Sequence, residues 1–221
     1  MLQDLRLRVC HLSSLHLRVF ASLWRFKTYS HLFFNSFVQV FAHRPTLVTF
    51  DIMCMELKVA GEAHIVGLYK IARAIGGPKP DNYFERALAG QECGEKRVLI
   101  AETDAIFAGY VMLEWHSPYP PFRAGHTPEM KDLNVAPAYR RRGIAWQLIE
   151  ECERLAREAG RQQIGIGVGL YADYGPAQRL YSRMAYTPDG RGIVYDGEQV
   201  TPGAQYPVDD SLCLMLVKAL G

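Results

Sequence analysis

The sequence predicts a mixed α/β (α+β) domain over residues 55–221. Along this part of the chain, apolar segments of strand length alternate with amphipathic segments of helix length. One strand, Lys131 to Val135, leads through a basic, glycine-containing turn directly into a long amphipathic helix. With 221 residues, 49% of them hydrophobic, the chain is long enough to bury a sizeable core.

The domain is expected to begin with one strand and two helices. Met55 to Ala60 has the composition of a strand. From Glu62 to Ile75 apolar residues recur at helical spacing, and Gly76-Gly77-Pro78 ends this helix. Asp81 to Ala89 is predicted as a shorter helix with Asp81 as its N-cap.

Two strands and a loop are expected next. Arg97 to Glu102 and Ile106 to Trp115 form a predicted hairpin around Thr103-Asp104-Ala105. The proline-rich segment from Ser117 to Pro128 is predicted as a loop, because prolines cluster in turns and connections. This loop leads to the strand that precedes the basic turn.

The remaining elements continue the alternation of strands and helices. A helix is predicted from about Ile144 to Ala159, a strand from Gln163 to Val168, and a helix from Pro176 to Met184. Leu212 to Val217 is predicted as the closing strand. Glycine and proline punctuate the segment from Gly190 to Asp210, where we expect irregular structure.

Three alternating glycines in Gly165-Ile166-Gly167-Val168-Gly169 resemble part of a dinucleotide-binding fingerprint. Leu170 stands where the third glycine of that fingerprint belongs, and no helix opens directly after it. We therefore predict that these glycines lie in a strand, where a bulge or a close backbone approach is their ordinary role.

The turn from Asn134 to Ala145 has the chemistry of a pyrophosphate-binding site. The first turn of a helix has backbone N–H groups without intrahelical partners, and the helix dipole adds positive charge there. Gly143 allows a ligand to approach the backbone closely, and Arg140 to Arg142 add fixed positive charge. Together these features predict that an anionic ligand binds at this turn.

Two motifs in this chain resemble signatures of the GNAT family of N-acetyltransferases. Arg140-x-x-Gly143-x-Ala145 is similar to the family's Gln/Arg-x-x-Gly-x-Gly/Ala motif. Tyr174 to Tyr186 is similar to Asn-x-x-Ala-x-x-Leu-Tyr-x-x-x-Gly-Phe, with matches at Ala177, Leu180 and Tyr181. The departures from that second signature are Tyr174 for Asn, Ala185 for Gly and Tyr186 for Phe. The resemblance extends over roughly Met55 to Leu220.

This resemblance implies a central mixed, largely antiparallel sheet flanked by helices, with a splayed strand pair at the acetyl-CoA site. It implies acetyl transfer from acetyl-CoA to a primary amine, on a small molecule or a protein, by direct attack in a ternary complex. A non-catalytic acyl-CoA-binding or sensing module of the same fold is the alternative. The residues that the resemblance places at acetyl-CoA are Leu133, Asn134, Val135, Arg140, Arg141, Arg142, Gly143, Ile144, Ala145, Tyr174, Ala177 and Tyr181.

The same resemblance suggests catalytic roles for particular residues. A backbone N–H near Leu133 would polarise the acetyl carbonyl. Tyr181 matches the family tyrosine that protonates the leaving thiolate. The general base is suggested by the residues and not by the resemblance. Glu114, at the end of a predicted strand, and Asp132, on the strand before the turn, could each deprotonate an ammonium through water, with Glu129 and His116 as weaker options.

The composition limits the kinds of ligand and partner that we expect this chain to bind. A net charge of only +2 does not indicate nucleic-acid binding. The five cysteines are scattered and form no Cys-x-x-Cys pair, which argues against a disulfide framework or a zinc site and suits a reducing, cytoplasmic location. We expect no metal and no membrane span, since no apolar run reaches about 18 residues. The amine acceptor stays open, and a homodimer is an option that the resemblance suggests.

Residues 1–54 differ from the rest in composition, with six basic residues against two acidic ones. Three interpretations stay open for this basic, apolar extension: an amphipathic or transit-like leader, an extra structural element, and an upstream start site with Met53 or Met55 as the true beginning. We favour the last, because the recognisable domain starts at residue 55.

Overall fold

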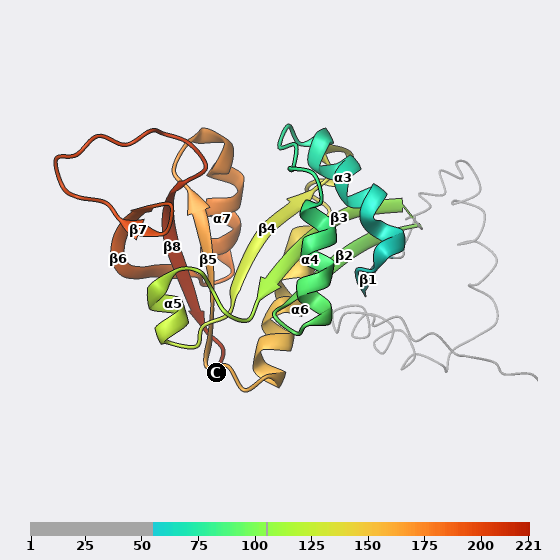
Figure 1. Cartoon of the computed structure of the whole chain (residues 1–221), viewed down its shortest axis with the longest axis horizontal. Coiled ribbons are helices and arrows are strands. Elements are labelled where there is room, and N and C mark those ends of the chain that lie inside the picture. Colours follow the sequence, from blue (N-terminus) through green and yellow to red (C-terminus); the bar gives the residue numbers. More distant parts are fainter. Residues whose placement is uncertain (1–54, 105) are drawn as a thin grey trace, which may run out of the picture. The chain divides into compact units, whose positions relative to one another are not determined.

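A computed structural model describes residues 55–104 and 106–221 (Figure 1). The extension predicted over residues 1–54 lies outside the described residues and stays a prediction. None of the helices in the described ranges has both the length and the apolar character needed to cross a bilayer.

An eight-stranded sheet forms the centre of the described domain, with strand order β1-β2-β3-β4-β5-β8-β6-β7. Neighbouring strands are antiparallel throughout, except that β4 and β5 are parallel. This confirms the predicted mixed, largely antiparallel sheet. The strands are β1 (Met55–Val59), β2 (Lys96–Thr103), β3 (Ile106–Glu114), β4 (Glu129–Val135), β5 (Gln163–Gly169), β6 (Thr187–Tyr195), β7 (Glu198–Gln199) and β8 (Leu212–Ala219).

Helices cover both faces of the sheet (Figure 1). On one face, α3 and α4 enclose a core that includes Leu68, Phe84 and Tyr110. On the other, α6 and α7 enclose a larger core that includes Leu148 and Ile164. The helices are α3 (Ile65–Ala74), α4 (Tyr83–Glu92), α5 (Pro120–Ala124), α6 (Ile144–Glu158) and α7 (Gly175–Arg183), with short 3₁₀ turns η1 (Glu62–His64), η2 (Pro137–Tyr139) and η3 (Ala172–Tyr174).

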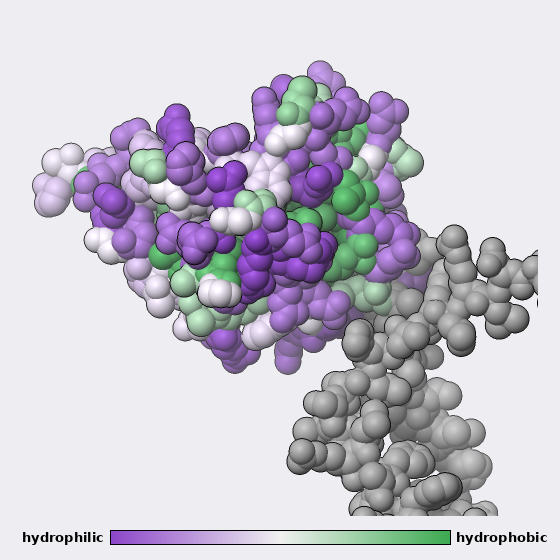
Figure 2. All heavy atoms as spheres, turned by 90° about the horizontal axis from the view of Figure 1, so that it is seen from below, coloured by the Kyte–Doolittle hydropathy of each residue, from purple (hydrophilic) through white to green (hydrophobic). Residues whose placement is uncertain are grey.

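The longest helix, α6, forms where the sequence repeats apolar residues at helical spacing. Ile144, Leu148 and Cys152 recur every four residues along α6 and are all buried against the sheet. Polar residues occupy the opposite side of the helix. Seen from below in Figure 2, hydrophilic residues cover most of the visible surface of the domain, and hydrophobic residues show only in separate patches.

Three local predictions were wrong. Asp81 does not cap α4, because Asn82 holds that position with a left-handed φ of 59° and makes no capping side-chain hydrogen bond. The predicted loop from Ser117 to Pro128 contains α5, whose first turn accepts prolines because its N–H groups need no intrahelical acceptor. The segment from Gly190 to Asp210 contains the end of β6 and all of β7.

The alternating glycines lie in β5, as predicted, and all three belong to one face of the strand. Ile164, Ile166 and Val168 alternate with them and are buried in the core under α6. A Cβ added to Gly165 would lie 2.2 Å from the ring of Phe122, and one added to Gly169 would lie 2.4 Å from the ring of Tyr174. The glycines therefore let aromatic rings lie directly on the β5 backbone, and we call this face the glycine strip.

Candidate functional site

The strands β4 and β5 separate soon after they meet. They pair at only two positions, Glu129 with Gly165 and Met130 with Ile166. Beyond these pairs the strands diverge, so the edge of β4 from residue 131 to 135 has no partner on β5 (Figure 1). The predicted splay is thereby confirmed, and it leaves backbone hydrogen-bonding groups available to an extended ligand.

A bulge in β4 lies at this splay. Tyr110 of β3 pairs with Asn134, but Met112 pairs with Lys131, so two residues of β4 stand opposite one residue of β3. Asp132 has a φ of 55°, which is a strained conformation for a residue other than glycine. The bulge turns Asp132 toward the α3 and α4 face, whereas Leu133 packs on the opposite core.

The basic turn joins β4 to α6. Arg141 and Gly143 both have left-handed φ values, of 63° and 81°, and Gly143 is the N-cap of the helix. In the described chain, the Arg140 amide donates to the Pro137 carbonyl over 3.3 Å, and the next amide to donate to a backbone carbonyl is that of Gln147, which bonds to Gly143 over 3.1 Å. No described atom lies within 4 Å of the position that a Cβ on Gly143 would take. The helix amides before Gln147 therefore remain available to an anion.

The arginines of the turn are exposed, while the residues that follow them anchor the helix. Arg140 donates through Nε to the carbonyl of Val135 over 3.2 Å, and the Arg142 guanidinium lies 5.3 Å from the centre of the Tyr139 ring. Ile144 is buried and Ala145 is half-buried. The turn therefore presents positive charge on a rigidly anchored backbone.

The helix α7 brings Ala177 and Tyr181 to the same core as Leu133 and Val135. Tyr181 is 5% exposed, and its hydroxyl forms no hydrogen bond with other described residues. Burial raises its pKa, so the phenol stays protonated at neutral pH. A protonated hydroxyl with no partner is a free proton donor.

Tyr174 lies at the start of α7 and packs its ring against Gly169. Its hydroxyl donates to Asp210 Oδ1 over 3.0 Å, and the hydroxyl of Tyr171 donates to the same oxygen. These bonds fasten the connection between β7 and β8 to the start of α7. The Tyr174 hydroxyl is therefore already engaged, and only its ring is available to a ligand.

Asp132 is the centre of a polar cluster on the α3 and α4 face. Its carboxylate pairs with Lys79 over 2.7 Å and accepts hydrogen bonds from Tyr83 and Tyr110, each over 3.2 Å. Asn134 Nδ2 also donates to this carboxylate, over 2.8 Å. The Asp132 carboxylate is thus surrounded by four donors. Through Lys79 and Tyr83 it connects the segment around the start of α4 to the bulge in β4.

The two other candidate carboxylates lie along the same face. Glu114 pairs with Lys96 over 3.1 Å at the end of β3. Glu129 is 6% exposed and accepts a 2.5 Å hydrogen bond from the Ser117 hydroxyl. Burial raises the pKa of Glu129 against the opposing effect of this bond. Sequence patterns ranked Glu129 low, because its burial depends on the chain around Ser117.

No group of three or more His, Cys, Asp or Glu side chains able to hold a metal ion occurs among the described residues. The splayed strand edge, the basic turn and Tyr181 are on or beside the core under α6 and α7. Asp132 lies on the opposite, α3 and α4 face of the sheet.

Comparison with protein families identifies this arrangement. Residues 65–186 match the model described as the acetyltransferase (GNAT) family. The chain belongs to this family. The match includes both motifs noted in the sequence, the basic turn and the segment from Tyr174 to Tyr186, and it makes the protein a GNAT acetyltransferase. A comparison with curated proteins found no significant match.

Solved GNAT structures share the fold. An N-acetyltransferase from Staphylococcus aureus Mu50 superimposes with a TM-score of 0.59 at 16% identity, over 76% of this chain and 99% of that chain. The yncA protein of Salmonella typhimurium, solved with its cofactor acetyl-CoA, gives 0.55 at 20% identity, over 76% and 94%. The paiA N-acetyltransferase of Thermoplasma acidophilum, in complex with coenzyme A, gives 0.52 at 15%, over 76% and 99%.

Proposed function

We propose that this GNAT protein transfers the acetyl group of acetyl-CoA to a primary amine, by direct attack in a ternary complex. The observation that carries the proposal is the splay of β4 and β5 beside the open amides of the basic turn. Acetyl-CoA has a pyrophosphate that suits the turn and pantetheine amides that suit the free strand edge. The solved relatives with acetyl-CoA or coenzyme A support the same donor.

The donor would extend along β4 from the turn. Arg140, Arg141 and Arg142 and the backbone of Gly143, Ile144 and Ala145 would hold the pyrophosphate. The backbone from Leu133 through Asn134 to Val135 would bind the pantetheine amides, with the Leu133 N–H aimed at the acetyl carbonyl. Ala177 and the ring of Tyr174 would line the other side, together with Tyr181.

In the proposed reaction the neutral amine nitrogen attacks the acetyl carbon, and the carbonyl oxygen gains negative charge that the β4 amide stabilises. The carbon–sulfur bond then breaks, and the thiolate takes a proton from the Tyr181 hydroxyl. The attacking nitrogen releases its extra proton to solvent as the amide forms, and solvent returns a proton to the Tyr181 phenolate. Tyr181 suits this role because a phenol is protonated at neutral pH and the Tyr181 hydroxyl has no hydrogen-bond partner among the described residues. General acid catalysis of this kind typically contributes about 10²–10⁴ in rate.

A base must accept the proton that the incoming ammonium loses. Among the carboxylates, we favour Glu129, because its pKa is raised and a base works best when its pKa approaches the working pH. Asp132 and Glu114 are the alternatives predicted from the sequence. Both are ion-paired, with Lys79 and Lys96 respectively, which fits structural anchoring better than proton transfer.

Calorimetric titration of acetyl-CoA tests the donor site. The decisive variant is Arg141→Gly, since glycine adopts the left-handed φ of residue 141 without strain and removes one positive charge. We expect micromolar binding to the wild type, and binding weakened about 3- to 10-fold in Arg141→Gly with no loss of stability. Arg73→Gln, at an exposed position in the last turn of α3, is the matched charge control.

Thiol release in the presence of a panel of amines then tests the reaction. Turnover with any primary amine supports the enzyme. Tight acetyl-CoA binding with no turnover across amines and amine-bearing peptides supports the sensing module instead. A folded wild type that does not bind acetyl-CoA refutes the proposal.

A further inference from the structure

Trp146 lies in an unusual position for a large aromatic residue. It is on the first turn of α6, three residues after Gly143, and it is 37% exposed. The other large hydrophobic residues that stand exposed in the described ranges are valines and isoleucines. The sheet-facing side of α6 is formed by Ile144 and Leu148, so Trp146 contributes little to that core.

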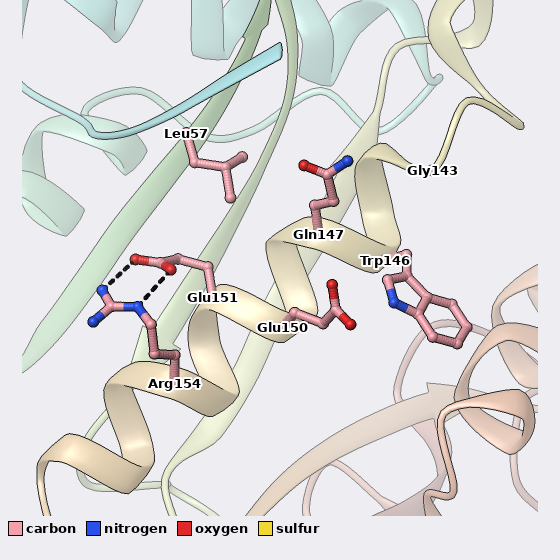
Figure 3. Close-up of a pocket in the computed structure, with 7 residues that line it drawn as sticks. All are labelled: Leu57, Gly143, Trp146, Gln147, Glu150, Glu151 and Arg154. Atoms are coloured by element: carbon pink, nitrogen blue, oxygen red, sulfur yellow. Dashed lines mark hydrogen bonds and ion pairs between the residues drawn. The ribbon is translucent and has the colours of Figure 1, made fainter. Parts of the chain in front are cut away.

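A shallow surface pocket of about 470 Å³ runs along this side of α6 (Figure 3). It begins at Gly143, the residue that opens the basic turn, and it includes Trp146. The helix residues that line it follow one another at spacings of three and four, so they form one continuous stripe. The lining residues are Leu57, Gly143, Trp146, Gln147, Glu150, Glu151 and Arg154. A ligand held by phosphate at the turn therefore has this stripe within reach.

Of the two glutamates that line this stripe, Glu151 is ion-paired and Glu150 is not. Glu151 is engaged by Arg154, over 2.6 Å, and Arg154 also pairs with Glu158. Glu150 has no ion pair or hydrogen bond with other described residues. In Figure 3 its carboxylate lies beside the indole of Trp146. An exposed aromatic face and a free hydrogen-bond acceptor thus stand together, one helical turn apart.

This pair has the chemistry of a purine site. A flat base stacks on an aromatic side chain, and an exocyclic amino group donates to a carboxylate. Phosphate is disfavoured beside Glu150 and Glu151, so the phosphates belong at the arginine turn. From Gly143 to Trp146 the helix rises about 4.5 Å, and from Gly143 to Glu150 about 10.5 Å. A nucleoside attached to a pyrophosphate at the turn spans a distance of that order.

We propose that Trp146 and Glu150 bind the adenine of the acetyl donor, with the ring stacked on the indole and the 6-amino group donating to the Glu150 carboxylate. This inference rests on the proposed function, since it requires a CoA thioester at the basic turn. It adds a recognition site for the nucleotide end of the donor, apart from the strand edge that holds the acetyl end.

Titration with two donors tests the proposal. Acetyl-CoA carries a pyrophosphate and the 3′-phosphorylated adenosine, whereas acetyl-4′-phosphopantetheine ends at a single phosphate and has no adenosine. We expect Trp146→Ala to weaken acetyl-CoA binding about 10-fold or more, and to leave acetyl-4′-phosphopantetheine binding unchanged. Trp146→Phe retains an aromatic face and should restore most of the affinity. Glu150→Ala should weaken only acetyl-CoA binding, by about 3- to 10-fold.

Glu158→Ala, at the other end of α6, is the matched control and should bind both donors like the wild type. Equal binding of acetyl-CoA by the wild type and Trp146→Ala overturns the adenine site but leaves the proposed function intact. An equal loss of both donors also overturns it, since the tryptophan would then support the turn itself. Failure of the wild type to bind acetyl-CoA overturns the proposed function, and the adenine site with it.

Discussion

Substitution of Gly165 by alanine should destabilise the domain through one identifiable contact. The added Cβ would lie 2.2 Å from Phe122 Cε2 and 2.5 Å from Phe122 Cζ, whereas carbon atoms in contact lie about 3.5–4.0 Å apart. The ring would have to move by more than about 1 Å to restore that contact distance. Phe122 is 2% exposed, so it has no solvent to move into. Overpacking of this kind costs about 1–3 kcal/mol in unfolding free energy.

The double variant isolates the contact. Phe122→Ala alone should cost about 3–5 kcal/mol, because it empties a buried ring site. In Gly165→Ala/Phe122→Ala the new methyl meets no ring, so the double variant should be no less stable than Phe122→Ala. The two costs therefore should not add, and the coupling energy should be about 1–3 kcal/mol.

Urea unfolding followed by circular dichroism measures all three variants. Gly77→Ala is the control, since its Cβ would lie 4.0 Å from the nearest side-chain atom and its backbone is not left-handed. It should change stability by less than about 1 kcal/mol. Additive costs for Gly165→Ala and Phe122→Ala, or a Gly165→Ala variant as stable as the wild type, would refute the close packing on the glycine strip.

Other predictions concern the reaction and the core. Tyr181→Phe should lower kcat about 10²–10⁴-fold with acetyl-CoA affinity unchanged by calorimetry, and a full-rate variant would remove Tyr181 as the acid. Because burial raises the pKa of Glu129 above 4.5, the rate should rise with pH beyond the ordinary glutamate range. Unfolding free energy should fall over that same window, since the unfolded chain holds fewer protons there. Glu129→Gln should abolish both effects, and a pH profile that instead follows the pKa of the amine acceptor would contradict the assignment. Lys218→Met should cost about 1–3 kcal/mol in a urea titration, because the buried Glu153 loses its 2.7 Å partner but keeps Arg157 at 3.3 Å and the Tyr186 hydroxyl at 3.0 Å. Glu153→Gln/Lys218→Met should recover part of that loss, and an unchanged single variant would show that the pair is not structural.

The sequence predicted those parts of the site whose residues lie close together along the chain. The turn before α6 is one continuous segment, so the glycine, the arginines and the helix periodicity stand together in the sequence. Tyr181 follows Ala177 by one helical turn, and the spacing of that motif placed both on one helix. Local order was enough to predict the strand, the turn and the helix.

The polar cluster around Asp132 had no such local signal. Its partners Lys79 and Tyr83 lie 53 and 49 residues away along the chain, and strand patterns do not report long-range pairing. The bulge that turns Asp132 toward them depends on the register with β3, which only the folded sheet fixes. Asp132 therefore looked like a free carboxylate, although four donors surround it.

The short helix α5 was missed for a different reason. Its two prolines are typical of loops, but proline is also compatible with the first turn of a helix. The segment before β4 then buries Phe122 against Gly165 and Ser117 against Glu129. Glu129 is buried because the segment around Ser117 packs over it. The composition and spacing of the sequence do not show this contact, so they gave no reason to prefer Glu129 as the base.

Asp210 hydrogen-bonds two segments that lie far apart along the chain. Its carboxylate accepts hydrogen bonds from Tyr171 and Tyr174, so the segment between β7 and β8 is fastened to the start of α7. Tyr181 lies two helical turns further along that helix. A ligand that displaces Asp210 must therefore break both hydrogen bonds or shift the start of the helix that carries Tyr181. A single carboxylate therefore joins the segment between β7 and β8 to the helix that carries Tyr181.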